Sequence, residues 1–168
     1  MAVTPTDTVT PGPTDAPPDA TATASFALEP ANDCTGTPDN RTFYSSVAAA
    51  VAWTVYCPVL PSGWFVEGGS YRLAGGGRLV ITYRGPAGAH FTLREGHWCT
   101  DGSGCAPAGS NGAATAFGDH EGSLVTGPDG SVTIVVDAGA PVSWELVGDG
   151  LDAGTIRMFG AALIAVGG

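Results

Sequence analysis

The sequence contains no lysine, and all six of its basic residues are arginines. Sixteen acidic residues outweigh them and leave a formal net charge of −10. Nucleic-acid binding needs a cationic surface that displaces counterions, so this composition predicts no nucleic-acid partner. The same charge disfavours electrostatic binding to an anionic membrane. The missing lysine also excludes a P-loop and any lysine-based covalent chemistry.

Long hydrophobic runs are absent as well. No stretch reaches the about 18 consecutive apolar residues of a membrane-spanning helix, so we expect no membrane insertion by this chain. The start of the chain lacks the basic and apolar regions of a signal peptide, because Met1-Ala2-Val3 leads directly into a polar tract. Three explanations fit such a start: an export segment has been removed, the chain is a fragment of a longer protein, or the protein is cytosolic.

Residues 2–30 are rich in proline, threonine, alanine and aspartate, and hold six of the 13 prolines. Only Phe26 and Leu28 offer large apolar side chains there, so burial cannot offset the conformational entropy of ordering the segment. We therefore predict a disordered tether over residues 1–31 and a single domain over residues 32–168. Thr/Pro tracts of this kind are typical of stalks that hold exported proteins to a wall or membrane anchor. A solvated tail without a role is the alternative.

Two helices are expected, one near each end of the domain. Residues 45–56 are rich in alanine, and Ser45 or Ser46 is placed to cap them. This helix should end at Cys57, because a residue that precedes proline avoids the helical region. The second helix is predicted over residues 153–167 and capped by Asp152, with one apolar stripe. The stripe consists of Ile156, Phe159, Leu163 and Val166.

Between the helices the apolar pattern changes to a period of two, which is typical of strands. Strands are predicted at 77–85, 89–96, 130–139 and 140–148, with two more at 64–73 and 117–126. Short Gly/Pro turns join successive strands, which indicates antiparallel pairing. The predicted fold class is α+β: an antiparallel meander of about six strands with both helices on one face. The other face should be partly exposed to solvent.

Several short motifs follow one another in an order that resembles a known family. They are Leu60-Pro61-Ser62-Gly63, Thr82-Tyr83, Gly122, Trp144 and the late alanines Ala161, Ala162 and Ala165. In this order the chain is similar, over about residues 43–167, to a family of bacterial extracytoplasmic domains of unknown function. Members occur at the C-terminus of anti-sigma-factor-like proteins and in lipoproteins. The resemblance implies an exported, non-enzymatic sensory or structural domain. A cysteine-bearing insertion at 97–116 departs from the family pattern.

The segment GHWCTDGSGC at 96–105 admits a zinc site or a disulfide. Zinc sites usually use cysteine pairs spaced C-x2-C, whereas Cys99 and Cys105 are spaced C-x5-C. His97 could be a further zinc ligand, but it does not change this cysteine spacing. Two glycines would let these cysteines approach bonding distance, and Cys34 and Cys57 would then form a second bridge. Four cysteines allow three connectivities, and free thiols are a third possibility. We favour two disulfides, no metal and no cofactor.

Other candidate sites are weaker. Asp119, His120 and Glu121 suggest metal or acid–base chemistry, but neighbouring side chains of a strand point to opposite faces. No G-x-S-x-G elbow supports a nucleophilic hydrolase. Trp98 stands among polar residues of the cysteine loop, so Trp98 and His97 are the candidate contact residues for a partner or glycan. Packing of Trp98 over the disulfide is the alternative.

The sequence therefore predicts an exported, surface-tethered domain that binds or senses and is not an enzyme. Its expected partner is an unidentified protein or cell-wall component, and the tether is expected to join it to a membrane anchor. A carrier of a hydrophobic ligand between sheet and helices is the alternative, and a hydrolase is a more remote one. A deep apolar cavity of a few hundred Å³ would favour the carrier.

Overall fold

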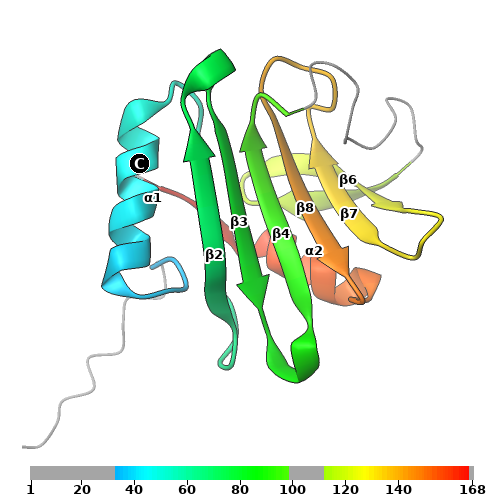
Figure 1. Cartoon of the computed structure of the whole chain (residues 1–168). Coiled ribbons are helices and arrows are strands. Elements are labelled where there is room, and N and C mark those ends of the chain that lie inside the picture. The colour runs from blue at the N-terminus through cyan, green and yellow to red at the C-terminus, as the bar shows by residue number, and fades with distance from the viewer. Residues whose placement is uncertain (1–32, 99–111, 167–168) are drawn as a thin grey trace, which may run out of the picture.

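A computed structural model describes residues 33–98 and 112–166 (Figure 1). Two α-helices, α1 (Pro38–Ala50) and α2 (Ala153–Ala161), lie near the two ends of this part of the chain. The strands are β1 (Tyr56–Pro58), β2 (Phe65–Arg72), β3 (Arg78–Arg84), β4 (His90–Gly96), β5 (Ala113–Phe117), β6 (His120–Thr126), β7 (Val132–Val136), β8 (Ser143–Asp149) and β9 (Leu163–Ala165). No helix among the described residues has the length and apolar character needed to cross a membrane.

Seven strands form one antiparallel sheet in the order β2-β3-β4-β8-β7-β6-β5, which confirms the α+β class. The order corrects the predicted six-strand meander, because β4 pairs with β8 rather than with β5. The sheet consists of two runs of hairpins, β2-β3-β4 and β8-β7-β6-β5, so β4 lies inside the sheet and β5 at its edge. The strand predicted at 117–126 is divided by a turn at Gly118, whose φ of +57° favours glycine. This turn separates β5 from β6.

The first helix begins earlier than predicted. Thr37 caps it, with the Asn40 backbone N–H donating to the Thr37 hydroxyl and the Asn40 side chain accepting from the Thr37 N–H. This reciprocal capping box and Pro38 in the first turn outweigh a start at Ser45. The helix also ends earlier, at Ala50, because the chain becomes extended at Val51. The predicted helix over 45–56 is therefore wrong in both bounds.

The second helix is capped by Asp152, as predicted, and the Asp152 carboxylate accepts from the Thr155 N–H at 3.0 Å. However, α2 ends at Ala161 instead of continuing to residue 167. Leu163–Ala165 forms β9, which pairs with β1 so that Ile164 faces Cys57. In this separate two-stranded sheet, β1 supplies the backbone groups that pair with β9. Neither segment could form this pairing if it were helical.

Both helices lie on the same face of the large sheet, as predicted. The Tyr44 hydroxyl of α1 is hydrogen-bonded to the Tyr83 hydroxyl of β3. Phe159 of α2 lies 5.0 Å, between ring centroids, from Phe91 of β4. Tyr83 and Phe91 are cross-strand partners whose rings stack at 4.7 Å, so the two helices meet one continuous core. Figure 1 shows α2 behind the sheet and α1 beside β2, so neither of these described helices covers the opposite face of the sheet, which we call the uncovered face.

Candidate functional site

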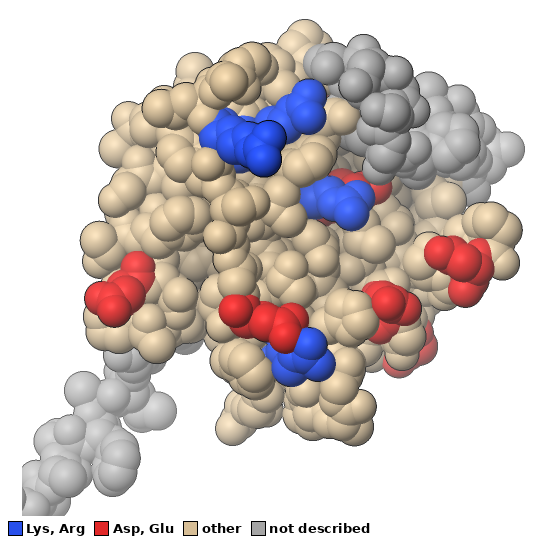
Figure 2. Space-filling view, viewed as in Figure 1, with Lys and Arg blue, Asp and Glu red and all other residues tan. Residues whose placement is uncertain are grey.

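The uncovered face of the sheet carries four of the six arginines. Along β3 and β4, buried apolar residues alternate with half-buried polar ones, so Arg78, Arg84 and Arg94 point away from the core. Arg72 at the end of β2 is the cross-strand partner of Arg78 and shares its face. Figure 2 shows basic side chains on this face, together with several acidic ones.

Two of these arginines are neutralised by acidic neighbours. The Arg84 Nε donates to the Glu67 carboxylate at 2.6 Å, and an Arg94 guanidinium nitrogen lies 2.7 Å from a Glu145 carboxylate oxygen. Within residues 33–98 and 112–166, the guanidinium groups of Arg72 and Arg78 have no acidic partner. Among the described residues, the positive charge at this end of the β2–β3 hairpin is therefore not neutralised.

The turn between β2 and β3 determines this juxtaposition. Its sequence, LAGGG at 73–77, contains three consecutive glycines at φ values of +70°, +93° and +95°. Side chains rarely adopt such conformations, so glycine is required for a hairpin of this shape. The hairpin places Arg72 and Arg78 directly opposite each other. Like charges in this position destabilise a sheet.

Trp98 completes one side of the same region. Its indole N–H donates to the Glu95 carbonyl at 2.7 Å and lies 3.3 Å from the Leu79 carbonyl, which fixes the ring over the sheet. The guanidinium carbons of Arg78 and Arg94 lie 5.4 and 5.9 Å from the ring centroid, within the range of cation–π contacts. Because the N–H is already used by the protein, the ring offers a ligand only its carbon surface.

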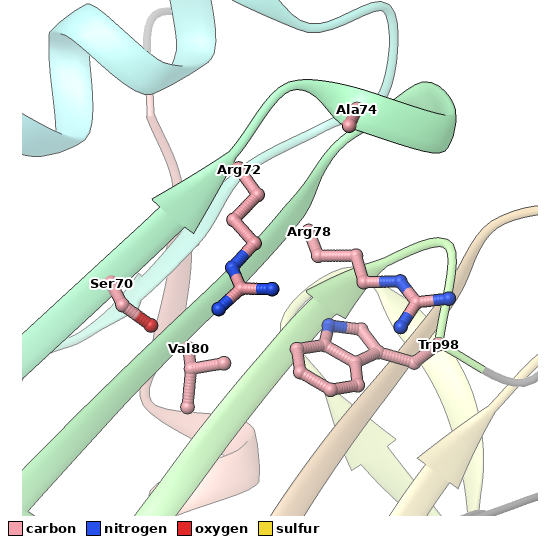
Figure 3. A pocket seen from close by; sticks show the side chains of 6 residues that line it. All are labelled: Ser70, Arg72, Ala74, Arg78, Val80 and Trp98. Carbon is pink, nitrogen blue, oxygen red and sulfur yellow. The ribbon is translucent and has the colours of Figure 1, made fainter.

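These side chains line a surface hollow of about 400 Å³, which we call the arginine pocket (Figure 3). Its lining residues are Ser70, Arg72, Ala74, Arg78, Val80 and Trp98. Figure 3 shows the Arg72 guanidinium on the side of the hollow near Ser70 and Val80, and the Arg78 guanidinium beside the Trp98 ring on the other side. The volume is near the lower end of the roughly 300–1,000 Å³ of small-molecule sites. Anions with an apolar part match this lining in chemistry.

The two contact residues predicted from the sequence occupy different positions. Trp98 lines the arginine pocket, and its role in binding stays a prediction. His97 packs behind the turn, where a side-chain carbon added to Gly76 would overlap its imidazole, and its backbone N–H donates to Gly77 at 3.0 Å. His97 thus supports the turn. Sequence reasoning missed Arg72 and Arg78, although both stand immediately beside the LAGGG turn.

The cysteines are only partly described. Cys34 and Cys57 form a disulfide with a Cα–Cα distance of 5.4 Å, which ties the segment before α1 to β1. Cys99 and Cys105 lie outside the described residues, so their disulfide and its zinc alternative stay predictions. Within 33–98 and 112–166, no group of three or more His, Cys, Asp or Glu side chains is arranged to hold a metal ion.

The Asp119–His120–Glu121 segment lines a surface hollow of about 450 Å³ at the β5–β6 hairpin, and two of its side chains also make packing contacts. The Tyr56 hydroxyl donates to Asp119 at 2.5 Å, and this bond lowers the pKa of the Asp119 carboxyl. Burial raises the pKa of Tyr56, so its phenol stays neutral and is no base. The His120 ring stacks on Trp144 at 5.2 Å. These contacts hold the β5–β6 turn against β1.

A buried acid lies on the other face of β4 from Trp98. Glu95 has no exposed surface, and both of its carboxylate oxygens lie within 3.2 Å of the Tyr56 backbone nitrogen. Burial raises the pKa of Glu95 well above its usual range, and the bond from Tyr56 offsets only part of this effect. Because the Glu95 carboxyl is sealed from solvent, it does not meet a ligand.

The space between α2 and the sheet is filled by aromatic rings. Trp64 packs edge-on against Phe159 at 4.7 Å, and Phe159 in turn packs on Phe91. The predicted carrier of a hydrophobic ligand would place its ligand in this layer. Between α1 and strands β2 and β3, however, the structure leaves a hollow of about 280 Å³, lined in part by Phe43, Tyr44, Val66 and Ile81. The carrier alternative therefore stays a prediction.

Comparisons with known proteins add no family to this picture. Protein-family models, curated proteins and solved structures were all searched, and none of them matches this chain. The resemblance to bacterial extracytoplasmic domains therefore stays a prediction, and the arginine pocket has to be interpreted from its own chemistry.

Proposed function

We propose that this chain is an extracytoplasmic, tethered binding or sensing domain without catalytic activity, and that it binds an anionic group in the arginine pocket. One observation carries the proposal: Arg72 and Arg78 face each other across a hairpin with no acidic partner among the described residues. Opposed like charges cost stability. An oxyanion between them would offset that cost and receive charge-assisted hydrogen bonds.

The chemistry of arginine favours such a ligand. A guanidinium group is always charged and presents a planar fork of donors that matches a carboxylate or phosphate. Each charge-assisted hydrogen bond contributes about 1.5–3 kcal/mol, so losing one arginine is expected to weaken binding about tenfold or more. The net charge of −10 keeps anions away from most of the surface, which makes a local cationic site selective.

The extracytoplasmic part of the proposal rests on two features. Disulfides persist in oxidising compartments, and the Cys34–Cys57 bridge suits such a location. The composition of residues 1–31 favours a stalk that joins the domain to a wall or membrane anchor. The partner would then be a protein or cell-wall component at the cell surface, bound by the uncovered face of the sheet.

The test is a titration of the ¹⁵N-labelled chain with sodium acetate and with sodium sulfate, followed by amide and indole NMR signals. We expect shifts that concentrate on residues 70–80 and on the Trp98 indole. The double substitution Arg72→Gln/Arg78→Gln should lower the affinity for both anions by about tenfold or more. Arg157→Gln is the matched control, because Arg157 is exposed on α2, away from the pocket. Equal binding by the double variant, or no saturable shifts, would refute the site.

A further inference from the structure

The arginine pocket contains more than a pair of charges, and its other walls restrict what the anion is attached to. Resting on the binding function proposed above, we propose that its ligand is a carboxylated sugar, a uronic acid that stands at the end of a glycan or is spaced along neutral sugars. The argument uses the number of free charges, the carbon surface of Trp98 and the exposure of the pocket.

The charges favour one or two negative groups rather than a dense polyanion. Arg84 and Arg94 are already paired with Glu67 and Glu145, so the described part of this face has two unneutralised cations. Asp149 adds a further exposed carboxylate next to His90 on the same face. At physiological ionic strength a charge acts over about 8 Å. A polyphosphate or nucleic-acid strand would therefore extend from the arginine pair into acidic surroundings.

The apolar wall of the pocket favours a ring. Trp98 and Val80 present carbon surface beside the guanidinium groups, and the indole N–H is directed into the protein. A bare inorganic anion would leave this surface in water. A sugar ring has a face of C–H groups that packs on an indole, and its hydroxyls would meet the Ser70 hydroxyl and spare guanidinium N–H groups. A uronic acid combines that face with one carboxylate.

The exposure of the pocket fits a residue of a longer chain. Ser70, Arg72 and Ala74 are exposed, and β2 is an edge strand of the sheet. A ligand held there keeps one side in solvent, so neighbouring sugars can continue along the surface. Enclosed sites for free metabolites instead bury most of the ligand. The mixed polar and apolar lining also does not suit a lipid chain.

Isothermal titration at low salt tests the inference with four probes: D-glucuronate, D-glucose, sodium acetate and inorganic phosphate. We expect glucuronate to bind at least fivefold more tightly than acetate or phosphate, and glucose to show no binding. Trp98→Ala should remove the advantage of glucuronate over acetate. Arg72→Gln should lower the affinity for both glucuronate and acetate by about tenfold, whereas Arg157→Gln should lower neither affinity.

The outcomes separate the two proposals. If acetate or phosphate binds and Arg72→Gln abolishes this binding, but glucuronate binds no more tightly than acetate or phosphate, the proposed anion site is supported and the proposed sugar ligand is wrong. If phosphate binds more tightly than glucuronate, the sugar is likewise wrong. If no anion binds, both proposals fail. Should Trp98→Ala fail to fold, the wild-type Trp98 indole signal replaces it: glucuronate must shift that signal more than saturating acetate does, and an equal shift refutes the inference.

Discussion

The Cys34–Cys57 disulfide is expected to supply a large share of the stability of the domain. The bridge joins residues separated by 23 positions. In the chain-entropy account, a bridge of this span restricts the unfolded chain by about 3.4 kcal/mol at 25 °C. Both cysteines are buried, so the double substitution Cys34→Ala/Cys57→Ala also removes packed sulfur atoms without burying a polar group. We expect the free energy of unfolding to fall by about 3 kcal/mol or more, and the midpoint temperature by roughly 10 °C.

Urea unfolding followed by tryptophan fluorescence measures the change, and peptide mapping of the non-reduced protein shows whether the linked peptide exists. Alanine substitution is preferable to a reducing agent, because a reductant would also act on any bridge between Cys99 and Cys105. Hydrogen bonds from the Thr35 N–H to Pro58 and from the Leu60 N–H to the Thr35 hydroxyl remain available to the variant. A loss below about 1 kcal/mol, less than a third of the entropic value, would refute the reasoning.

Three further predictions concern single residues. Burial raises the folded-state pKa of Glu95, so the contribution of Glu95 to stability is present below about pH 4.5 and is lost as pH rises through the raised pKa. The midpoint temperature of Glu95→Gln should therefore rise relative to that of wild type as pH increases from about 4.5 through the raised pKa. A difference in midpoint temperature that does not depend on pH would contradict this prediction. Tyr56→Phe should raise the carboxyl pKa of Asp119 toward its usual range in a ¹³C NMR titration, since the Tyr56 hydrogen bond is the main cause of its lowering; an unchanged titration counts against that bond. Gly76→Ala should cost about 1–3 kcal/mol in urea unfolding, because φ is +93° and the new methyl group would overlap His97; a neutral result would contradict this turn geometry.

The central strands could be predicted because their burial alternates strictly. Leu79, Ile81 and Tyr83 are buried on β3, and their neighbours along the strand are not. Asp152 was predictable as a cap because its carboxylate is placed to accept from an N–H of the first turn. These features depend on a few neighbouring residues, so local pattern is sufficient to find them.

Features that depend on distant partners were missed. Leu163–Ala165 continues an apolar helical stripe, but β1 offers it backbone partners and it becomes a strand. The pairing of β4 with β8 joins segments about fifty residues apart along the chain, which strand periodicity does not encode. The candidate site needed both kinds of information. The LAGGG turn between Arg72 and Arg78 was visible in the sequence, whereas the absence of a neighbouring carboxylate among the described residues required the sheet order.

The measurement that tests the central claim most directly is the unfolding free energy of wild type and Arg72→Gln, with and without saturating D-glucuronate. If the arginine pair is held unneutralised for an anion, Arg72→Gln without ligand should be more stable than wild type by about 0.2–1 kcal/mol, because an opposed like-charge pair is removed. Glucuronate should then stabilise wild type markedly more than the variant. A variant that is less stable without ligand and gains as much from glucuronate as wild type would contradict the account.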